Sequence, residues 1–305
     1  MDASAAGSGK LVAGIELGGT KCIALLARGM EIVQSARIPT TTPEETLSKA
    51  ARHFEQWRAD IGEPAALGIA SFGPLGLDKG RTDYGHITKT PKQGWADSDI
   101  VGYFANRMGM PIGFDTDVTG AALAEYRWGA AQDCDVAVYL TVGTGIGGGA
   151  IVNGRPVHGL VHPEIGHVRV RRRAGDDFPG TCPFHGDCIE GLAAGPAITR
   201  RAGKAGDAIT ADDPVWTDVT LEMAELMATL ILTLSPRRII IGGGVFQGQR
   251  QLFRPLRART AELLARYVAR IDAAALDQLI VPPALGDRAG PLGAVALALD
   301  ALRIA

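Results

Sequence analysis

Two stretches of the chain repeat one pattern, in which a buried strand runs into a turn of glycines and a second strand returns. The first reads LVAGIEL and then GGTKCIALLARG, from residue 11 onward. The second reads DVAVYLTV, GTGIGG and GAIVNG, from residue 135 onward. Apolar runs of this length are typical of buried strands, and glycine suits the tight turn that joins them. We therefore predict an internal duplication, with a hinge near residues 114–117.

Helical periodicity follows the first strands. In TTPEETLSKAARHFEQWR, Thr42 and Glu45 match a capping box, and Pro43 takes the first helical position. The apolar residues from Leu47 to Trp57 then share one face of the predicted helix. Further predicted elements are a helix over residues 219–234, a strand that runs into a glycine turn within residues 237–245, and a helix over 253–270.

The length of 305 residues leaves room for two domains. We predict a smaller N-terminal α/β domain of residues 1–116, onto which a C-terminal helix of about residues 290–305 packs back. Residues 117–289 are expected to form a larger α/β domain that includes a metal-binding loop.

The two glycine turns are candidates for anion binding. Backbone N–H groups approach an anion closely where no side chain intervenes. Gly18–Lys21 adds a hydroxyl and an ammonium group to such a turn, and Gly143–Gly148 offers a second one. The alternative is simple hairpin geometry, since glycine also supplies the positive φ of tight turns. Residues 143–148 also fit G-x-G-x-x-G, but a dinucleotide site needs a helix next, and a strand follows here.

An aspartate precedes the next predicted helix. FDTDVTGAALAEYRWG places Asp115 and Asp117 between an apolar strand, residues 110–114, and that helix. Aspartate is common at such positions as a cap or turn former. Beside a bound polyphosphate, Asp117 could instead accept the proton of an attacking hydroxyl, which typically contributes about 10²–10⁴-fold to a rate.

Two cysteines and a histidine lie within seven positions of CPFHGDC. Cys182, His185 and Cys188 are three side chains of the kind that bind zinc, and His167 is the nearest upstream histidine that could complete a tetrahedron. The alternatives are a pair of buried thiols or a Cys182–Cys188 disulfide. The set leaves no position open for water, so we expect a structural metal.

Two carboxylates flank this cluster. Glu164 lies three residues before His167, and Glu190 lies two after Cys188. A metal that holds these segments would aim both carboxylates at one place, where they could accept hydrogen bonds from the hydroxyls of a sugar. We interpret His162 as an ordinary loop histidine and not as a ligand.

Charge and hydropathy exclude several classes of protein. The net charge of −2 predicts no general attraction to nucleic acid or to a membrane surface. The start of the chain, MDASAAGSGK, lacks the apolar core of a signal peptide, and four cysteines are few. We therefore expect a cytoplasmic protein without a membrane span.

Five motifs in a fixed order resemble the ROK sugar kinases, and within them the bacterial fructokinase branch. They are GIELGGTK, DTDVTGAALAE, TVGTGIGGG, HPEIGHV and CPFHGDCIEGL. The resemblance extends over residues 11–301, and SFGPL (71–75) and GHITKTPKQGW (85–95) are also similar to that branch.

The resemblance implies an actin-like ATPase fold, of the ribonuclease H-like kind, with ATP and a sugar in an interdomain cleft. It implies Asp117 as the base and Mg²⁺ bound with ATP. The implied sugar contacts are Glu164, His167, Glu190, Gly73 and Pro74. The implied zinc ligands are His167, Cys182, His185 and Cys188. The implied nucleotide and phosphate contacts are Gly18, Gly19, Thr20, Lys21, Gly143, Thr144, Gly145, Gly195, Pro196, Gly242, Gly243 and Gly244. A homodimer is also implied.

Three departures from the usual motifs of this family bear on the identity of the substrate. Glu16 stands where many members of the family carry aspartate, and Thr116 stands where asparagine often precedes the catalytic aspartate. The cluster reads Cys-Pro-Phe-His, and not the Cys-x-Cys of typical ROK glucokinases, which favours fructose over glucose. The expected activity is therefore phosphorylation of the 6-hydroxyl of D-fructose.

Several other functions are weighed beside this one. A glucokinase, a mannokinase or an N-acylhexosamine kinase would share the motifs. A sugar-sensing regulator would need a helix-turn-helix ahead of the strand that begins near Leu11, and the sequence leaves no room for one. A non-catalytic sugar-binding scaffold is disfavoured by the presence of Lys21 and Asp117.

Overall fold

The computed structural model describes residues 9–304, which form two compact units. Unit 1 contains the described residues up to Arg127, together with Pro156–His162 and the described residues from Asp287 onward. Unit 2 contains Trp128–Arg155 and Pro163–Gly286. Residues 1–8 of the predicted first domain and residue 305 of the predicted last helix lie outside the described part.

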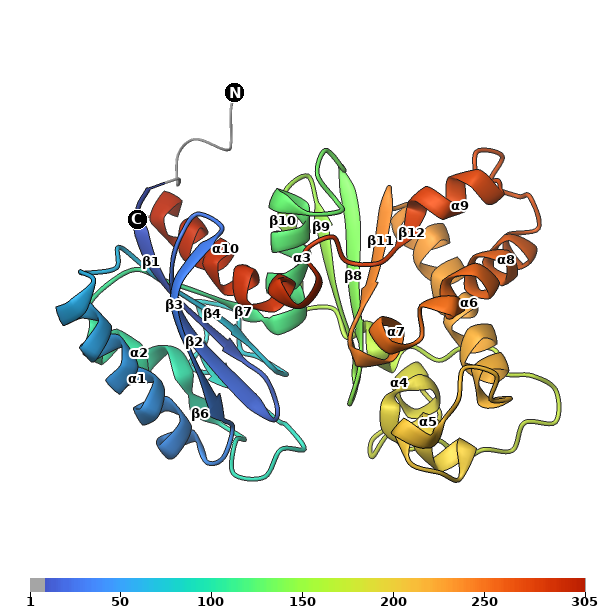
Figure 1. The fold of residues 1–305 in the computed structure, drawn as a ribbon, viewed down its shortest axis with the longest axis horizontal. Helices are drawn as coiled ribbons and strands as arrows, with labels where there is room; N and C mark the ends of the chain where they lie inside the picture. The colour runs from blue at the N-terminus through green and yellow to red at the C-terminus, as the bar shows by residue number, and fades with distance from the viewer. Residues whose placement is uncertain (1–8, 305) are drawn as a thin grey trace. The chain divides into compact units, whose positions relative to one another are not determined.

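Unit 1 is built on a five-stranded sheet of order β3-β2-β1-β4-β7 (Figure 1). The first three strands form the predicted antiparallel meander, and β4 and β7 run parallel to β1. Its strands are β1 (Leu11–Leu17), β2 (Lys21–Arg28), β3 (Glu31–Pro39), β4 (Leu67–Ser71) and β7 (Ile112–Thr116), beside a small pair, β5 (His86–Ile87) and β6 (Ser98–Asp99). Its helices are α1 (Pro43–Asp60), α2 (Ile100–Met108), α3 (Asp117–Trp128, whose last residue is counted in unit 2) and α10 (Ala289–Ile304).

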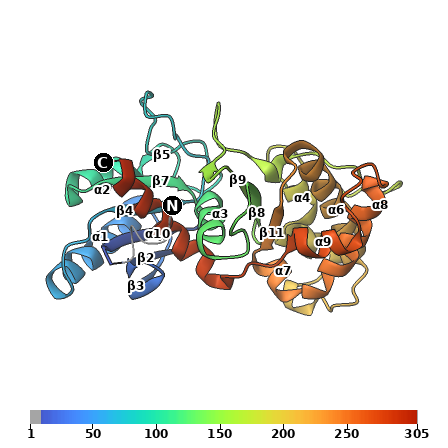
Figure 2. The same ribbon diagram turned by 90° about the horizontal axis from the view of Figure 1, so that it is seen from above.

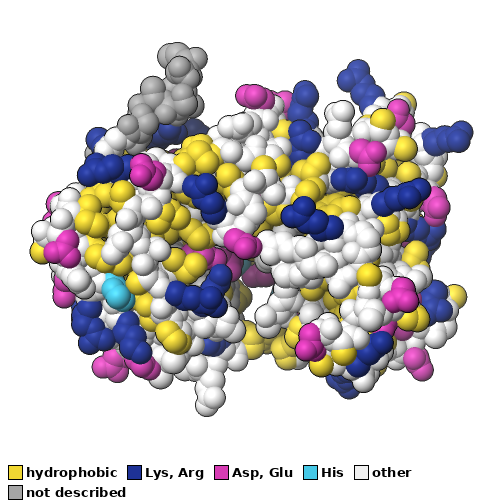
Figure 3. Space-filling view, viewed as in Figure 1, with side chains coloured by type: hydrophobic (Ala, Val, Ile, Leu, Met, Phe, Trp, Pro, Cys, Tyr) yellow, Lys and Arg dark blue, Asp and Glu magenta, His cyan; other side chains and the backbone are white. Residues whose placement is uncertain are grey.

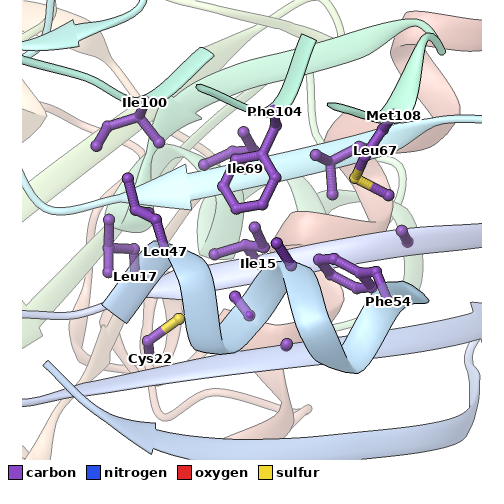
Figure 4. Packing of buried hydrophobic residues seen from close by; sticks show 14 of the residues in the cluster. Ile15, Leu17, Cys22, Leu47, Phe54, Leu67, Ile69, Ile100, Phe104 and Met108 are labelled. Atoms are coloured by element: carbon purple, nitrogen blue, oxygen red, sulfur yellow. The ribbon is translucent and has the colours of Figure 1, made fainter. Parts of the chain in front are cut away.

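Helix α1 begins as its sequence predicts. Thr42 Oγ accepts a hydrogen bond from the Glu45 N–H at 3.3 Å, and Pro43 is the first helical residue. The Glu45 carboxylate does not return to the Thr42 N–H but accepts from Thr41 Oγ at 2.6 Å. The apolar face of α1 joins α2 and one face of the sheet in a core drawn in Figure 4. Its largest fully buried members include Ile15, Phe54, Ile69 and Phe104.

The opposite face of this sheet holds α10 against a row of glycines. Gly14, Gly68 and Gly113 are paired in register across β1, β4 and β7. A Cβ atom on Gly68 would lie 1.8 Å from the Ala294 carbonyl oxygen, and one on Gly113 would lie 2.2 Å from that of Leu297. The missing side chains therefore let α10 lie directly on the strands.

Helix α3 packs against α10 in the same way. A Cβ on Gly293 would lie 2.4 Å from the carbonyl carbon of Gly120, so the two helices meet backbone to backbone. This contact accounts for the assignment of α3 to unit 1. The chain thus leaves this unit after Arg127, at the end of α3, whereas the sequence suggested a boundary at residues 116–117, at its start.

Unit 2 repeats the topology of unit 1 in a sheet of order β10-β9-β8-β11-β12. Strand β8 pairs antiparallel with β9 and parallel with β11, as β1 pairs with β2 and β4. Figures 1 and 2 show α6, α8 and α9 gathered on one side of this sheet. Its strands are β8 (Val136–Val142), β9 (Ile146–Val152), β10 (Arg155–Pro156, whose last residue is counted in unit 1), β11 (Arg238–Gly242) and β12 (Ile280–Val281). Its helices are α4 (Ile189–Ala193), α5 (Gly195–Ala202), α6 (Val215–Leu234), α7 (Gly244–Gly248), α8 (Phe253–Leu264) and α9 (Ala273–Leu279).

One predicted helix is shorter than expected. The helix predicted over residues 253–270 ends at Leu264, because Ala265 and Arg266 adopt left-handed φ angles of 48° and 61°. Left-handed backbone ends a right-handed helix, and the Ala265 N–H closes the last turn on the Ala261 carbonyl.

The surface agrees with the small net charge. On the face drawn in Figure 3, basic and acidic side chains are interspersed and not gathered by sign. Among residues 9–304, no helix combines the length and the apolar character needed to cross a bilayer.

Candidate active site

Three predicted site segments of unit 1 leave its sheet at one edge. Leu17, Ser71 and Thr116 are register partners at the ends of β1, β4 and β7. Because parallel strands lie about 4.8 Å apart, the segments that follow them emerge within about 10 Å of one another. Those segments are the glycine turn 18–21, the loop that contains Gly73 and Pro74, and Asp117. The carboxyl ends of parallel strands are where open α/β sheets bind ligands.

The first glycine turn is a tight hairpin. The Gly18 N–H donates to the Lys21 carbonyl at 2.9 Å, and Thr40 Oγ donates to the Gly18 carbonyl at 2.8 Å. Gly19 and Thr20 are exposed at its tip, and nothing lies within 4 Å of the place a Cβ on Gly19 would take. The turn therefore presents bare backbone to the solvent, as an anion site requires.

Glu16, just before this turn, has an unusual environment. Burial raises the pKa of its carboxyl group, and the positive charge of Lys21 opposes that rise while Asp287 adds to it. Its Oε2 is buried without a hydrogen-bond partner among the described residues. The carboxylate fits against Gly290, where a Cβ would lie 2.4 Å from Oε1. A carboxylate oxygen without a partner among the described residues, next to a candidate anion-binding turn, suits Mg²⁺, which binds oxygen ligands directly or through water.

Asp117 is the first residue of α3. Its Oδ1 accepts a hydrogen bond from the Val118 N–H at 2.9 Å, and the residue is half-buried. The carboxylate is thus oriented by the first turn of its own helix.

Asp115, two residues earlier, is paired with a histidine that the sequence did not single out. Its Oδ2 lies 2.9 Å from His158 Nε2, and its Oδ1 accepts from the Thr116 N–H at 2.7 Å. The hydrogen bond to Asp115 raises the pKa of His158, and burial opposes that rise. No local signal links the two residues, since they meet only in the folded unit.

This pair predicts a pH-dependent stability. A histidine pKa raised above its ordinary value of 6.5 stabilises the fold fully below about pH 6.5, and the gain is lost as pH rises through the folded-state pKa. The melting temperature of His158→Gln should therefore fall furthest below that of the wild type near pH 6, and the gap should narrow by about pH 9. His53→Gln, on α1, is the control. A gap that widens with pH would contradict the pairing.

Three glycine segments meet in unit 2. The turn 143–145 follows β8 and the segment 242–244 follows β11, and these strands are parallel neighbours. The Gly195 N–H donates to the Gly143 carbonyl at 2.7 Å, so α5 begins at the same turn. Gly243, at a φ of 85°, lies so close to β8 that a Cβ would be 2.4 Å from the Val142 carbonyl oxygen. The predicted nucleotide contacts of unit 2 are therefore neighbours.

Glu190 also reaches this turn. Its Oε2 accepts a hydrogen bond from the Ile146 N–H at 3.0 Å, and a Cβ on Gly145 would lie 2.6 Å from the same oxygen. The residue lies in the first turn of α4, a helix that begins directly after Cys188. Glu190 therefore connects the Cys/His cluster to the glycine turn, a contact that residue spacing could not predict.

The Cys/His cluster closes as its spacing predicts. One ligand atom from each of four residues lies within 4.8 Å of the others, and the four are His167, Cys182, His185 and Cys188. A turn closed by hydrogen bonds between Cys182 and Gly186 brings His185 back to Cys182, with Gly186 at a φ of 65°. The four cysteines of the chain are free thiols, so the disulfide alternative is not the one observed.

The donor set fits zinc. Zinc bonds of about 2.3 Å to sulfur and about 2.0–2.1 Å to nitrogen place the two ligand atoms about 3.5 Å apart in a tetrahedron. His167 Nδ1 lies 3.5 Å from Cys188 Sγ and 3.8 Å from Cys182 Sγ, and His185 Nδ1 lies 3.8 Å from Cys182 Sγ. Burial raises the pKa of the Cys188 thiol to about 11, which favours the protonated thiol. A bound cation would instead favour the thiolate, the form that binds a metal.

Glu164 lies on the outer side of the cluster. Its Oε2 is 4.0 Å from His167 Nε2, the ring nitrogen that faces away from the sulfurs, and the side chain is exposed. His162 is not part of this cluster. It is buried in unit 1, where its Nε2 accepts a hydrogen bond from the Leu75 N–H at 3.0 Å. His162 is therefore outside the metal cluster, as expected, but its burial and its hydrogen bond give it a specific contact that the sequence did not indicate.

Similarity to known proteins extends over nearly the whole chain. A sequence model of the ROK family matches residues 12–301. A fructokinase from Zymomonas mobilis is 44% identical over 96% of this chain and 97% of its own. Among solved structures, a ROK hexokinase from Thermus thermophilus matches with a TM-score of 0.79 at 27% identity, covering 97% of this chain and 100% of its own. A ROK glucokinase from Streptomyces griseus, solved with glucose and AMPPNP, matches with a TM-score of 0.76 at 26% identity, covering 95% and 99%.

Proposed function

The chain belongs to the ROK family, and from this premise we propose that it is an ATP-dependent fructokinase, which phosphorylates the 6-hydroxyl of D-fructose. The observation that carries the proposal is the common sheet edge of unit 1, where the turn 18–21 and Asp117 emerge from β1 and β7, the strands on either side of β4. A phosphate-binding turn next to a carboxylate is what phosphoryl transfer to an alcohol needs. The similarity to a fructokinase supports fructose as the alcohol.

In this reaction the sugar oxygen O6 forms a bond to the γ-phosphorus of ATP, and the bond from that phosphorus to ADP breaks. Asp117 accepts the proton that O6 releases. Lys21 and the bare backbone of the glycine turns stabilise the charge on the phosphate oxygens. Mg²⁺, when bound with ATP, neutralises part of that charge, and Glu16 is the carboxylate nearest in sequence to the turn that could hold it.

The Cys/His cluster has a supporting role in the proposal. A structural zinc held by its four side chains would fix the start of α4, and with it Glu190. His167 would also be fixed, and its outer nitrogen faces Glu164. Glu164, His167 and Glu190 would then present oriented partners to sugar hydroxyls. The proposal includes a homodimer in the cytoplasm, where reduced thiols remain available to a metal.

A coupled assay of ADP release tests the proposal. With MgATP and fructose, we expect turnover that depends on the sugar, and NMR of the product should show the phosphate on O6. ATP without sugar should release little ADP, because exclusion of water favours transfer over hydrolysis. Absence of sugar-dependent ADP release would exclude the activity, and phosphate on O1 would exclude the proposed acceptor atom.

A further inference from the structure

A buried histidine in unit 1 has no part in the proposed reaction so far. It lies in residues 156–162, here called the strap, which belongs to unit 1 although the chain enters it from unit 2 and returns there afterwards. His162, the last residue of the strap, is 5% exposed. A buried polar side chain usually has a specific partner, so its contacts indicate what it does.

The partner is the segment of residues 71–75, here called the sugar loop because it contains Gly73 and Pro74. The front of this loop is fixed by backbone contacts, since the Phe72 N–H donates to the Leu17 carbonyl at 2.8 Å. Its far side is fixed at Pro74, whose carbonyl accepts from the Thr88 N–H at 2.8 Å and from Thr88 Oγ at 3.1 Å.

A further contact comes from the strap. The Leu75 N–H donates to His162 Nε2 at 3.0 Å, and both residues are buried. The ring also lies against Gly73, where a Cβ would be 3.5 Å from the same nitrogen. Nε2 can accept this hydrogen bond only without a proton of its own, so the neutral ring carries its proton on Nδ1. A buried N–H that lost this acceptor would destabilise the loop conformation.

A second histidine fixes the strap itself. His158 Nε2 pairs with Asp115 Oδ2 at 2.9 Å, and Asp115 lies in β7 two residues before Asp117. The strap is therefore held at two points on the sheet edge that carries the site segments of unit 1. A ring held in this way has few alternatives to its contact with the sugar loop.

We propose that His162 is a positioning residue, which holds Gly73 and Pro74 in the conformation that binds the sugar. This inference rests on the proposed function. Loss of the acceptor should weaken sugar binding and leave ATP binding nearly unchanged, because the segments 143–145, 195–196 and 242–244 belong to unit 2. A residue that merely filled space would not separate the two substrates.

Steady-state kinetics of His162→Leu and His162→Gln test this role. Leucine fills the space without an acceptor, whereas the glutamine Oε1 can accept from the Leu75 N–H. For His162→Leu we expect the KM for fructose to rise about tenfold, with the KM for ATP nearly unchanged. For His162→Gln the KM for fructose should stay within about threefold of the wild type. His53→Leu, the same change on α1, should leave both constants unchanged.

Several results would overturn the assignment. They are an unchanged KM for fructose in His162→Leu, equal losses in both variants, or a parallel rise in the KM for ATP. Nitrogen NMR of the wild-type protein decides the matter if His162→Leu does not fold. It should show Nε2 of His162 without a proton, and the opposite tautomer would contradict the proposal. If the wild type does not phosphorylate fructose, the proposed function fails. The tautomer of His162 would still test its hydrogen bond with the Leu75 N–H separately.

Discussion

Asp117→Asn should lower kcat for fructose phosphorylation by about 10²–10⁴-fold, the usual contribution of a general base. The amide has nearly the shape of the carboxylate, and its oxygen can still accept the hydrogen bond that the Val118 N–H donates to Asp117 Oδ1. It cannot take a proton from the sugar hydroxyl. Helix α3 should therefore begin as before, and the KM values should change little.

The comparison needs a variant with the same chemical change elsewhere. Asp135→Asn provides it, because Asp135 is an exposed residue just before β8. We expect this control to keep the wild-type kcat. Measurement of kcat by ADP release, with product analysis by NMR, distinguishes the two variants. A kcat near that of the wild type in Asp117→Asn would remove Asp117 from the role of base.

Cys188→Ser should abolish metal binding and most of the activity. Cys188 is fully buried and lies directly before α4, which carries Glu190. Structural zinc contributes about 10–16 kcal/mol to the folding of small zinc peptides, so its loss should release this segment. A displacement of about 1 Å in a positioning group can cost about 100-fold, and we expect a fall of that size in kcat/KM for fructose.

Metal analysis and kinetics on the same preparations check this expectation. The wild type should contain one equivalent of zinc per chain, and Cys188→Ser should contain none and unfold at a lower temperature. Cys134→Ser is the matched control, because Cys134 is a buried free thiol outside the cluster. Full activity of the wild type without any transition metal would contradict a structural role for zinc.

Local patterns were sufficient for much of the fold. The strand–glycine–strand repeat predicted β1, β2, β8 and β9, because hydrophobic runs and glycine turns are encoded within a few residues. The start of α1 was predicted equally well from Thr42 and Pro43. The Cys/His cluster could be found because three of its four ligands lie within one short turn.

Features that depend on the register between strands, or on contacts between distant segments, could not be predicted from local sequence patterns. Gly14, Gly68 and Gly113 show no local signal, since they lie inside strands and acquire a role only when the sheet aligns them beneath α10. The contact of Glu190 with the Ile146 N–H also joins distant segments.

The contacts of the two strap histidines could not be predicted from the sequence for the same reason. His162 resembles a surface loop residue in sequence, and only its contact with Leu75, 87 residues away, reveals that it is buried and bonded. His158 likewise finds Asp115 from a different part of the chain.

The most direct test of the account is the ratio of kcat/KM values for fructose, mannose and glucose, measured by ADP release on one zinc-containing preparation. We predict that fructose exceeds both other hexoses by at least about tenfold, as oriented acceptors for particular hydroxyls should produce. A kcat/KM for glucose or mannose equal to or above that for fructose would contradict the account.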